Sequence, residues 1–297
     1  MTAKTKPNSY NRNRIEFVDL ILLVVMVAFA LLIVVPLWHV IAMSFATQKE
    51  YLDTPLLLIP RAPTISAYTA LFNDGRIWIG YRSTLTLVAL GVPVNMLLTT
   101  TFAYALSRGH FPGRKGLMFL IVFTMLFQGG IIPLYLTMRD YGLLDSMWSV
   151  VFATGVNTFY MILMMNYFSG IPISLIESAR IEGAGEWRIL FQIVLPLSLP
   201  IIATVGLYYL SDRWNEWYNP MIFINSSRKT VLQLVLRNIV NETKQADDFV
   251  YEGMKEMPFT SGVKMAAVVM TMLPVMCAYP FLQRYFLKGM RVGAVKG

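Results

Sequence analysis

Long apolar stretches alternate with shorter polar segments along almost the whole chain. A transmembrane helix needs about 20 consecutive, mainly apolar residues, and none of these stretches shows the period-two alternation of a membrane β-strand. Because hydrocarbon offers the backbone no hydrogen-bond partner, stretches of this length are expected to be α-helices. Six of them meet the criterion, at residues 17–45, 83–106, 117–138, 148–168, 199–224 and 263–287. The pattern therefore predicts an all-α, polytopic membrane protein with six transmembrane helices.

The composition agrees with a membrane protein and argues against other classes. Hydrophobic residues make up 56% of the 297 residues and charged residues only 14%, whereas soluble domains carry roughly 25% charged residues. The single cysteine excludes an intramolecular disulfide framework. A secretory signal has an apolar core of about 7–15 residues. The first apolar run is much longer, so we expect an uncleaved membrane helix there.

The distribution of basic residues predicts the orientation of the spans. The loop at residues 107–116 carries three basic and no acidic residues, whereas the loop at 140–147 carries two acidic and no basic residues. Short basic loops face the cytoplasm, and an even number of spans places both termini on one side. We expect a cytoplasmic N-tail (1–16), a transmembrane domain (17–287) with external segments at 47–81 and 225–262, and a cytoplasmic C-tail (288–297). The basic residues behind the net charge of +8 cluster beside the apolar runs, as expected of membrane orientation. The charge therefore does not indicate nucleic-acid binding.

The second external segment and the polar segment at residues 170–198 both contain predicted helices. Residues 225–262 mix apolar and acidic side chains in a pattern that favours a short amphipathic helix. In the polar segment, Ser174 followed by Glu177 predicts a capping box at a helix start. The sequence Gly183, Ala184, Gly185 predicts a tight turn, and Glu186 suits the positive N-terminal end of a second helix. The segment is thus expected to be a helix-turn-helix unit; an amphipathic helix lying on the membrane surface is the alternative.

This polar segment resembles the cytoplasmic coupling loop, or EAA motif, of bacterial ABC importer permeases. The matching residues are Glu177, Ala179, Gly183, Phe191, Leu195, Pro196 and Pro200, while Ser178 replaces the first alanine of the motif. Residues 130–135, 142–144, 214–216 and 283–289 are similar to the maltose-type (carbohydrate uptake class 1) branch. The long segment at 225–262 is similar to permeases that serve larger or acidic oligosaccharides, including alginate and uronate oligomers.

The resemblance implies a type I ABC importer permease fold and a role in carbohydrate import by alternating access. Its implied partners are a homologous second permease, an ATPase dimer that carries ATP and Mg, an extracytoplasmic solute-binding protein, the carbohydrate substrate and membrane lipid. No cofactor is expected on this chain, and the implied location is the bacterial cell (inner) membrane. The residues implied to couple with the ATPase are Ser174, Glu177, Ser178, Ala179, Arg180, Glu182, Gly183, Ala184, Trp187 and Arg188.

Polar residues inside two apolar runs form a candidate substrate path. Ionisable groups are costly in hydrocarbon and are functional candidates by default; the polar or charged residues of the fifth run are Asp212, Arg213, Asn215 and Glu216, with Trp214 among them. Neighbours in a helix do not share a face, so Arg213 is expected to find partners on other helices or on a companion subunit. The resemblance also places residues 214–216 on the translocation path. In the third run Gln128 is a candidate, and the glycines after it with Pro133 predict a kink. A purely structural role for these groups is the alternative.

The chain lacks the motifs of an ATPase or a hydrolase. It contains no G-x-x-x-x-G-K-[ST] phosphate loop and no H-E-x-x-H or G-x-S-x-G signature. We therefore expect a transport subunit that is not itself an enzyme, has no catalytic or metal site, and relies on ATP hydrolysis in a separate chain. An ion- or proton-coupled secondary transporter is the main alternative, but it should show internal repeats with acidic ion sites. A membrane-embedded enzyme would need a convergent nucleophile or metal set.

Overall fold

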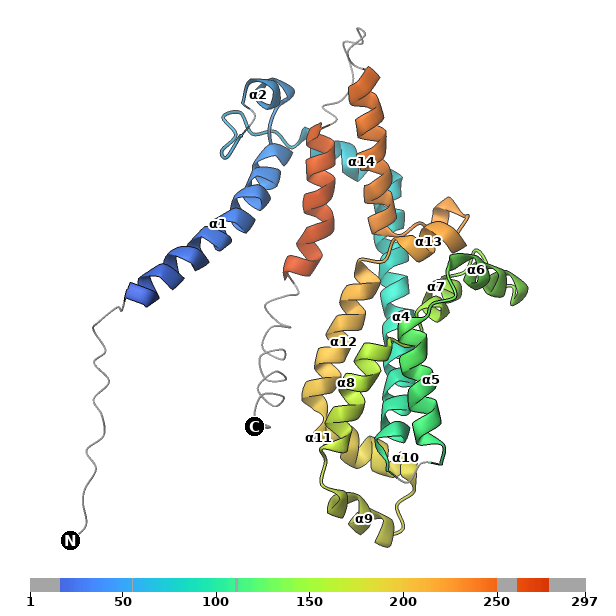
Figure 1. Cartoon of the computed structure of the whole chain (residues 1–297). Coiled ribbons are helices and arrows are strands. Elements are labelled where there is room, and N and C mark those ends of the chain that lie inside the picture. Colours follow the sequence, from blue (N-terminus) through green and yellow to red (C-terminus); the bar gives the residue numbers. More distant parts are fainter. Residues whose placement is uncertain (1–16, 55, 110–111, 250–260, 278–297) are drawn as a thin grey trace, which may run out of the picture.

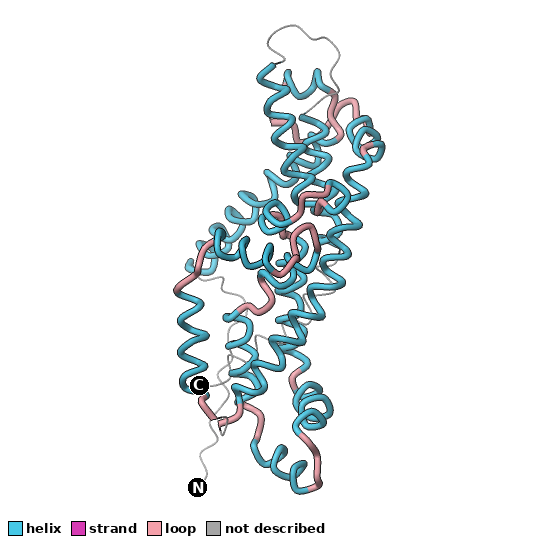
Figure 2. Tube along the Cα trace, turned by 90° about the vertical axis from the view of Figure 1, so that its right-hand side faces the viewer, coloured by secondary structure: helices cyan, strands magenta, loops and turns pink. Residues whose placement is uncertain are grey.

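The computed structural model describes residues 17–54, 56–109, 112–249 and 261–277, and within these ranges it contains helices and loops but no strand (Figure 2). The all-α class is therefore confirmed. The helices are α1 (Phe17–Ser44), α2 (Gln48–Asp53), α3 (Ser66–Asn73), α4 (Gly75–Ser107), α5 (Arg114–Leu126), α6 (Ile131–Asp140), α7 (Met147–Ala153), α8 (Thr158–Ser169), α9 (Ile173–Ile181), α10 (Glu186–Ile189), the π-helix η1 (Leu190–Val194), α11 (Leu195–Leu197), α12 (Leu199–Trp214), α13 (Tyr218–Phe223), the 3₁₀-helix η2 (Ser227–Lys229), α14 (Leu232–Phe249) and an unlabelled helix at Ser261–Cys277.

Only two of the described helices, α1 and α4, are long and apolar enough to cross a membrane alone. Three further spans would each consist of a bent pair of helices: α5 and α6 meet at 114°, α7 and α8 at 59°, and the α10–α11 unit meets α12 at 87°. The continuous helices expected at 117–138 and 148–168 are therefore wrong in detail, since each is interrupted by a bend. The helix expected at 199–224 is interrupted as well, because α12 ends at Trp214 and α13 begins only at Tyr218. The sixth predicted span is described only as far as Cys277, and its remainder lies outside the described residues. The count of six spans stays a prediction.

The break between α5 and α6 replaces the kink expected in the third run. Gly130 has a φ of +84°, in the left-handed region that disfavours any residue with a Cβ atom. Pro133 is the third residue of α6, where its missing N–H costs little because the first turn of a helix has no internal acceptor for it. Glycine thus ends one helix and proline fits the beginning of the next.

Helix α4 is the longest element and runs along most of the molecule (Figure 1). It packs against α8, α12, α14 and α7. It begins at Gly75, well before the expected start at residue 83, because Asp74 caps it by accepting a 2.9 Å hydrogen bond from the N–H of Arg76. These four helices therefore all pack on one continuous helix.

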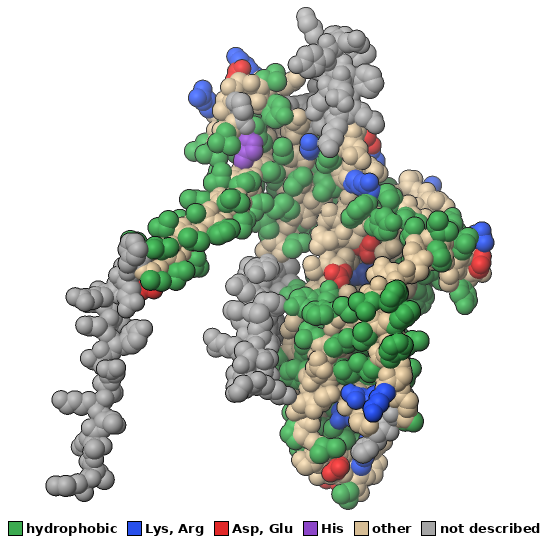
Figure 3. All heavy atoms as spheres, viewed as in Figure 1, with side chains coloured by type: hydrophobic (Ala, Val, Ile, Leu, Met, Phe, Trp, Pro, Cys, Tyr) green, Lys and Arg blue, Asp and Glu red, His purple; other side chains and the backbone are tan. Residues whose placement is uncertain are grey.

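Helix α1 stands apart from this bundle (Figure 1). The most apolar 18-residue window in Val18–Ser44 has none of its residues buried, and hydrophobic side chains cover the surface of α1 in Figure 3. Only its C-terminal end is packed, where Met43 and Ala46 contact Leu57. Its exposed apolar surface requires lipid or another chain to cover it.

The two segments predicted to be external, at residues 47–81 and 225–262, both contain helices within their described residues. The amphipathic helix predicted between residues 225 and 262 is confirmed as α14, whose side chains Leu232, Val235 and Ile239 are buried. Val235 and Ile239 belong to the same apolar cluster as Ala266 of the helix Ser261–Cys277. The other segment contains α2 and α3, and Thr47 with Glu50 forms a capping box at the start of α2.

Candidate functional site

The polar segment folds as the expected helix-turn-helix unit at one end of the molecule (Figure 1). Its first helix, α9, begins at Ile173, with Pro172 at the N-cap and no side-chain capping bond. The predicted capping box is therefore wrong. Ser174 already lies inside the first turn, since the fixed φ of Pro172 sets the extended approach directly before the helix.

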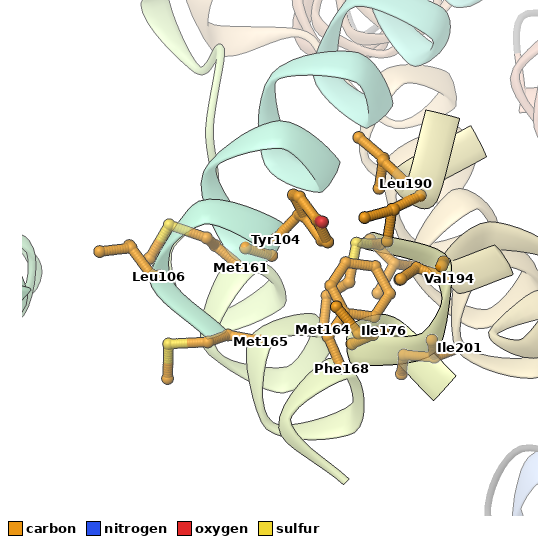
Figure 4. Packing of buried hydrophobic residues seen from close by; sticks show 14 of the residues in the cluster. Tyr104, Leu106, Met161, Met164, Met165, Phe168, Ile176, Leu190, Val194 and Ile201 are labelled. Atoms are coloured by element: carbon orange, nitrogen blue, oxygen red, sulfur yellow. The ribbon is translucent and has the colours of Figure 1, made fainter. Parts of the chain in front are cut away.

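Two apolar residues hold α9 to the bundle. Ile176 and Ala179 are buried at 1% and 8% exposure in a cluster with Phe168, Leu190 and other residues (Figure 4). Leu175, the residue before Ile176, is 46% exposed. Burying an isoleucine side chain contributes roughly 1.5–3 kcal/mol, so α9 is attached firmly through a narrow contact.

The turn after α9 depends on Gly183. Its φ is +83°, and it closes the helix because its N–H donates to the carbonyl of Arg180 at 3.0 Å, while the N–H of Ala184 donates to that of Ala179 at 2.9 Å. This pair of bonds is a Schellman motif, which favours glycine at its left-handed position. No atom lies within 4 Å of the position that a Cβ on Gly183 would occupy, so backbone conformation and not crowding requires glycine.

Polar contacts tie the turn to α4. The guanidinium of Arg180 donates to Oε1 of Glu186 at 2.7 and 3.0 Å, and the hydroxyl of Tyr104 donates to Oε2 of the same carboxylate at 2.6 Å. The side chains of Arg180 and Glu186 are 45% and 53% exposed, so solvent screens their ion pair and its contribution to stability is small. The arrangement fixes geometry: both sides of the turn and the end of α4 meet at one carboxylate.

Most of the residues expected to couple with an ATPase face outward. Of the ten, only Ala179 is buried and Ala184 half-buried; the exposed ones are Ser174, Glu177, Ser178, Arg180, Glu182, Gly183, Trp187 and Arg188. The structure adds Ile173 and Ile181, which are 60% and 88% exposed next to them. Sequence reasoning missed these two because isoleucine in an amphipathic segment is normally assigned to the core.

The candidate substrate-path residues of the fifth run lie around the C-terminal end of α12. Asp212 accepts a 3.0 Å hydrogen bond from the hydroxyl of Tyr160, and Asn215 donates to the carbonyl of Ser211 at 2.9 Å. Both side chains are exposed, and Glu216 is half-buried, with its carboxylate 3.3 Å from the N–H of Asn219. The carboxylate of Glu216 also lies 3.8 Å from the guanidinium of Arg213, so Asp212 and Asn215 are the more accessible of the three polar groups.

Two other candidates are placed differently. The ring of Trp214 is buried, with its indole N–H unpaired and its centroid 6.5 Å from that of Tyr81. Gln128 lies exposed in the break between α5 and α6, and among the described residues no hydrogen bond joins it to the end of α12. Within the described ranges no group of three or more His, Cys, Asp or Glu side chains is placed to hold a metal ion.

Arg213, which we expected to find partners on other helices or on a companion subunit, is buried next to these residues. Arg213 is 2% exposed, and its guanidinium donates to Oδ1 of Asn95 at 3.0 and 3.1 Å and to the carbonyls of Val150, Val151 and Thr154 at 3.0–3.2 Å. Asn95 itself donates to the carbonyls of Thr154 and Gly155 at 3.0 and 2.6 Å. The sequence signal for Asn95 was a polar residue deep within an apolar run, but its pairing with Arg213 was not predicted.

The pair of Arg213 and Asn95 explains the break between α7 and α8. The last carbonyls of a helix have no partner within it, and in a low-dielectric surrounding each needs one. Here the two side chains from α12 and α4 supply those partners and place a positive charge at the negative end of α7. Gly91 makes room for the arginine, since a Cβ there would lie 2.9 Å from its Nε. We call this group the arginine joint: Arg213, Asn95 and the carbonyls that they bind.

Away from the arginine joint, Asp145 connects the loop before α7 to η2. Its carboxylate accepts hydrogen bonds from the N–H groups of Ser226 and Asn225 at 2.9 and 3.1 Å and lies 3.1 Å from Nζ of Lys229. The bond from Ser226 and the ammonium of Lys229 hold the pKa of Asp145 below its ordinary value. The carboxylate is therefore ionised across the physiological pH range.

Comparison with known proteins gives consistent matches along almost the whole chain, although no protein-family model matches it. The chain is 41% identical over 280 residues to the polygalacturonan/rhamnogalacturonan transport system permease protein YtcP of Bacillus subtilis, covering 94% of this chain and 98% of that protein. It is 27% identical to the diacetylchitobiose uptake system permease protein NgcG of Streptomyces coelicolor, over 87% of this chain and 83% of that protein. Among solved structures, it matches a bacterial ABC transporter involved in the import of the acidic polysaccharide alginate, with a TM-score of 0.82, 31% identity, and coverage of 95% of this chain and 100% of that chain.

Proposed function

The chain belongs to the permease family of carbohydrate ABC importers, and from this premise we propose that α9 and the turn after it receive the movement of a separate ATPase. As a permease, the chain is a membrane transport subunit and does not itself catalyse a reaction. Neither a secondary transporter nor a membrane enzyme is favoured by its relatives.

The observation that carries this proposal is the two-sided character of α9. One side is anchored in the core through Ile176 and Ala179, while the surrounding polar residues and the exposed Ile173 and Ile181 face outward. Exposed apolar side chains beside charged ones are typical of a protein interface. A short helix of this kind can be held by a partner and still move the bundle to which it is attached.

The contacts of the turn give a route for that movement. Glu186 connects Arg180 with Tyr104 of α4, and the α10–α11 unit continues into α12 through the 87° bend. A displacement of α9 would therefore be passed to both α4 and α12. These are the helices that carry the arginine joint and the polar residues at the end of α12.

The other subunits of the importer are proposed from family membership and from surfaces of this chain that are exposed in the structure. We propose that a homologous second permease or lipid covers α1, that an ATPase dimer with ATP and Mg binds the α9 side, and that a solute-binding protein contacts the external segments. The proposed location is a bacterial cell membrane with both termini in the cytoplasm, in agreement with the basic loop at residues 107–116. No cofactor is assigned to this chain.

We propose an oligosaccharide as the substrate, in line with the names of the relatives. The polar side chains of Asp212, Asn215 and Glu216 offer the hydrogen-bonding groups that sugar hydroxyls need. Trp214 lies between them in the sequence, but its ring is buried against Tyr81. A transporter alternates between states that differ in affinity for its partners, so a loaded binding protein can bias it only by preferring one state.

The experiment is to reconstitute the importer in vesicles and to compare two matched glycine variants. Gly183→Leu and Gly113→Leu both place a side chain at a positive φ, of +83° and +76°, with no atom within 4 Å of the new Cβ. Only the first lies in the α9 turn. We expect Gly183→Leu to abolish ATPase stimulation by the loaded binding protein and to weaken co-purification with the ATPase, and Gly113→Leu to retain both.

A second variant tests the exposed surface without backbone strain. Glu177→Lys reverses one outward charge of α9 and should also weaken co-purification. If Gly183→Leu and Glu177→Lys both couple to the ATPase as well as Gly113→Leu does, the assignment of α9 is refuted.

A further inference from the structure

A cavity of about 300 Å³ lies far from the α9 turn, between the N-terminal part of α4, the start of α7 and η2. Its lining includes Arg82 and Thr86 of α4, Trp148 of α7, and Arg228 and Lys229 of η2. Arg82 precedes Tyr104, which contacts the α9 turn, by 22 residues of one helix, or about 33 Å at 1.5 Å per residue. The cavity therefore lies far along α4 from the α9 turn and, in the proposed orientation, toward the side from which a substrate enters an importer.

The charges around this cavity are not balanced. Lys229 is paired with Asp145 at 3.1 Å, but neither Arg82 nor Arg228 has a side-chain hydrogen bond or an ion pair within the described part of the chain. Two guanidinium groups from different elements thus line one small space without a counter-charge. Both side chains are exposed, and their combined positive charge favours the binding of an anion.

The other lining groups indicate the kind of anion. Guanidinium groups bind carboxylates through paired hydrogen bonds. The ring of Trp148 offers a flat apolar surface for the CH face of a sugar, and the hydroxyl of Ser83 also lines the space. The volume is at the lower end of the range for ligand sites, which suits a single sugar ring better than a larger ligand.

We propose that this cavity is a subsite for the carboxylate of a uronic acid residue in the transported oligosaccharide. The inference rests on the proposed function, because it requires that this chain transports oligosaccharide. It goes further by assigning the acidic group to Arg82 and Arg228, which lie outside the polar group at the end of α12. A lipid phosphate or an acidic side chain of the binding protein would use the same charges, and the test separates these sources.

The test measures import of trigalacturonate and of its uncharged methyl ester by the complete reconstituted importer. In the double variant Arg82→Gln with Arg228→Gln, we expect the apparent KM for the acid to rise about tenfold, the loss of about one charged hydrogen-bonded contact, with no change for the ester. Arg139→Gln is the matched control, since Arg139 is an exposed arginine paired with Asp140 outside the cavity. A variant with Arg82→Lys in place of Arg82→Gln, which keeps the positive charge, should regain part of the affinity for the acid relative to the double variant. A misfolded protein would not show this recovery.

Each other outcome contradicts a specific part of the reasoning. Equal changes for acid and ester would overturn the subsite and indicate docking of the binding protein, or of a lipid if the change disappears in vesicles that lack anionic lipid. Unchanged KM values in the double variant, or import of the ester but not the acid by the unmodified importer, would also overturn it. Failure of the unmodified importer to take up any oligosaccharide would refute the proposed function itself.

Discussion

Replacing Arg213 by methionine should destabilise the permease strongly, because it removes the centre of the arginine joint. The substitution keeps a long apolar stem but leaves the carbonyls of Val150, Val151 and Thr154 without their charged donor. An unsatisfied buried polar group costs about 1–3 kcal/mol, and breaking a buried charged network costs about 3–5 kcal/mol. Asn95 still binds the carbonyl of Thr154, and methionine recovers apolar contact. We therefore expect a net loss of about 3 kcal/mol.

The assay is thermal unfolding of the purified protein in detergent, followed by tryptophan fluorescence. A loss of about 3 kcal/mol corresponds to a fall of roughly 5–10 °C in the midpoint for a chain of this size. Asn95→Leu should also lower the midpoint, and the double variant should cost less than the sum of both, because the two side chains stabilise the same carbonyls. Arg139→Met provides the baseline for loss of an exposed arginine.

Either of two results would refute this reasoning. One is a midpoint for Arg213→Met no lower than that of Arg139→Met. The other is full additivity in the double variant, which would mean that Arg213 and Asn95 act on separate parts of the fold.

Three further changes test neighbouring features. Gly91→Ala should lower the midpoint by an amount equivalent to about 1–3 kcal/mol, because the new Cβ would lie 2.9 Å from Nε of Arg213 and force it to move; an unchanged midpoint would show that the joint has room. Asp145→Asn should lower the midpoint at neutral pH, since a carboxyl with a lowered pKa stabilises the fold above its ordinary pKa; the difference from the unmodified protein should vanish as the pH falls through the lowered value, and a difference that grows in acid would contradict this. Ile176→Ala removes a buried contact worth about 2–4 kcal/mol, so α9 should loosen and fewer sugars should be imported per ATP hydrolysed, whereas the exposed Leu175→Ala should leave this ratio unchanged.

The sequence predicted those features that depend on neighbouring residues. Apolar runs located the helices, because a bilayer-length run has few alternatives to a helix. The turn at Gly183 was predictable because a Schellman motif forms within one helix end. The amphipathic helix α14 was predictable because its buried positions recur with helical period.

The features that were missed depend on partners far away in the sequence. The break between α7 and α8 leaves backbone carbonyls without a partner in their own helix. Arg213 and Asn95, from two other helices, donate hydrogen bonds to these carbonyls. Within residues 148–168 the local signal is Asn157, which caps α8 by accepting hydrogen bonds from the N–H groups of Phe159 and Tyr160, but nothing there identifies the partners of the α7 carbonyls. The capping box failed for a different reason: Pro172 starts the helix directly, so Ser174 lies too far inside it to act as a cap.

The contacts of α4 suggest why the bundle tolerates so many interrupted spans. Three of the spans are broken or sharply bent, and each break removes a direct mechanical connection along the chain. Helix α4 is continuous over 33 residues and touches the α9 turn at Tyr104, the arginine joint at Asn95, and the cationic cavity at Arg82. A continuous helix keeps its hydrogen-bonded backbone when it tilts, so a displacement at one end reaches the other. In the proposed mechanism the breaks would allow neighbouring segments to turn around α4, while the arginine joint would hold α7 and α12 to it.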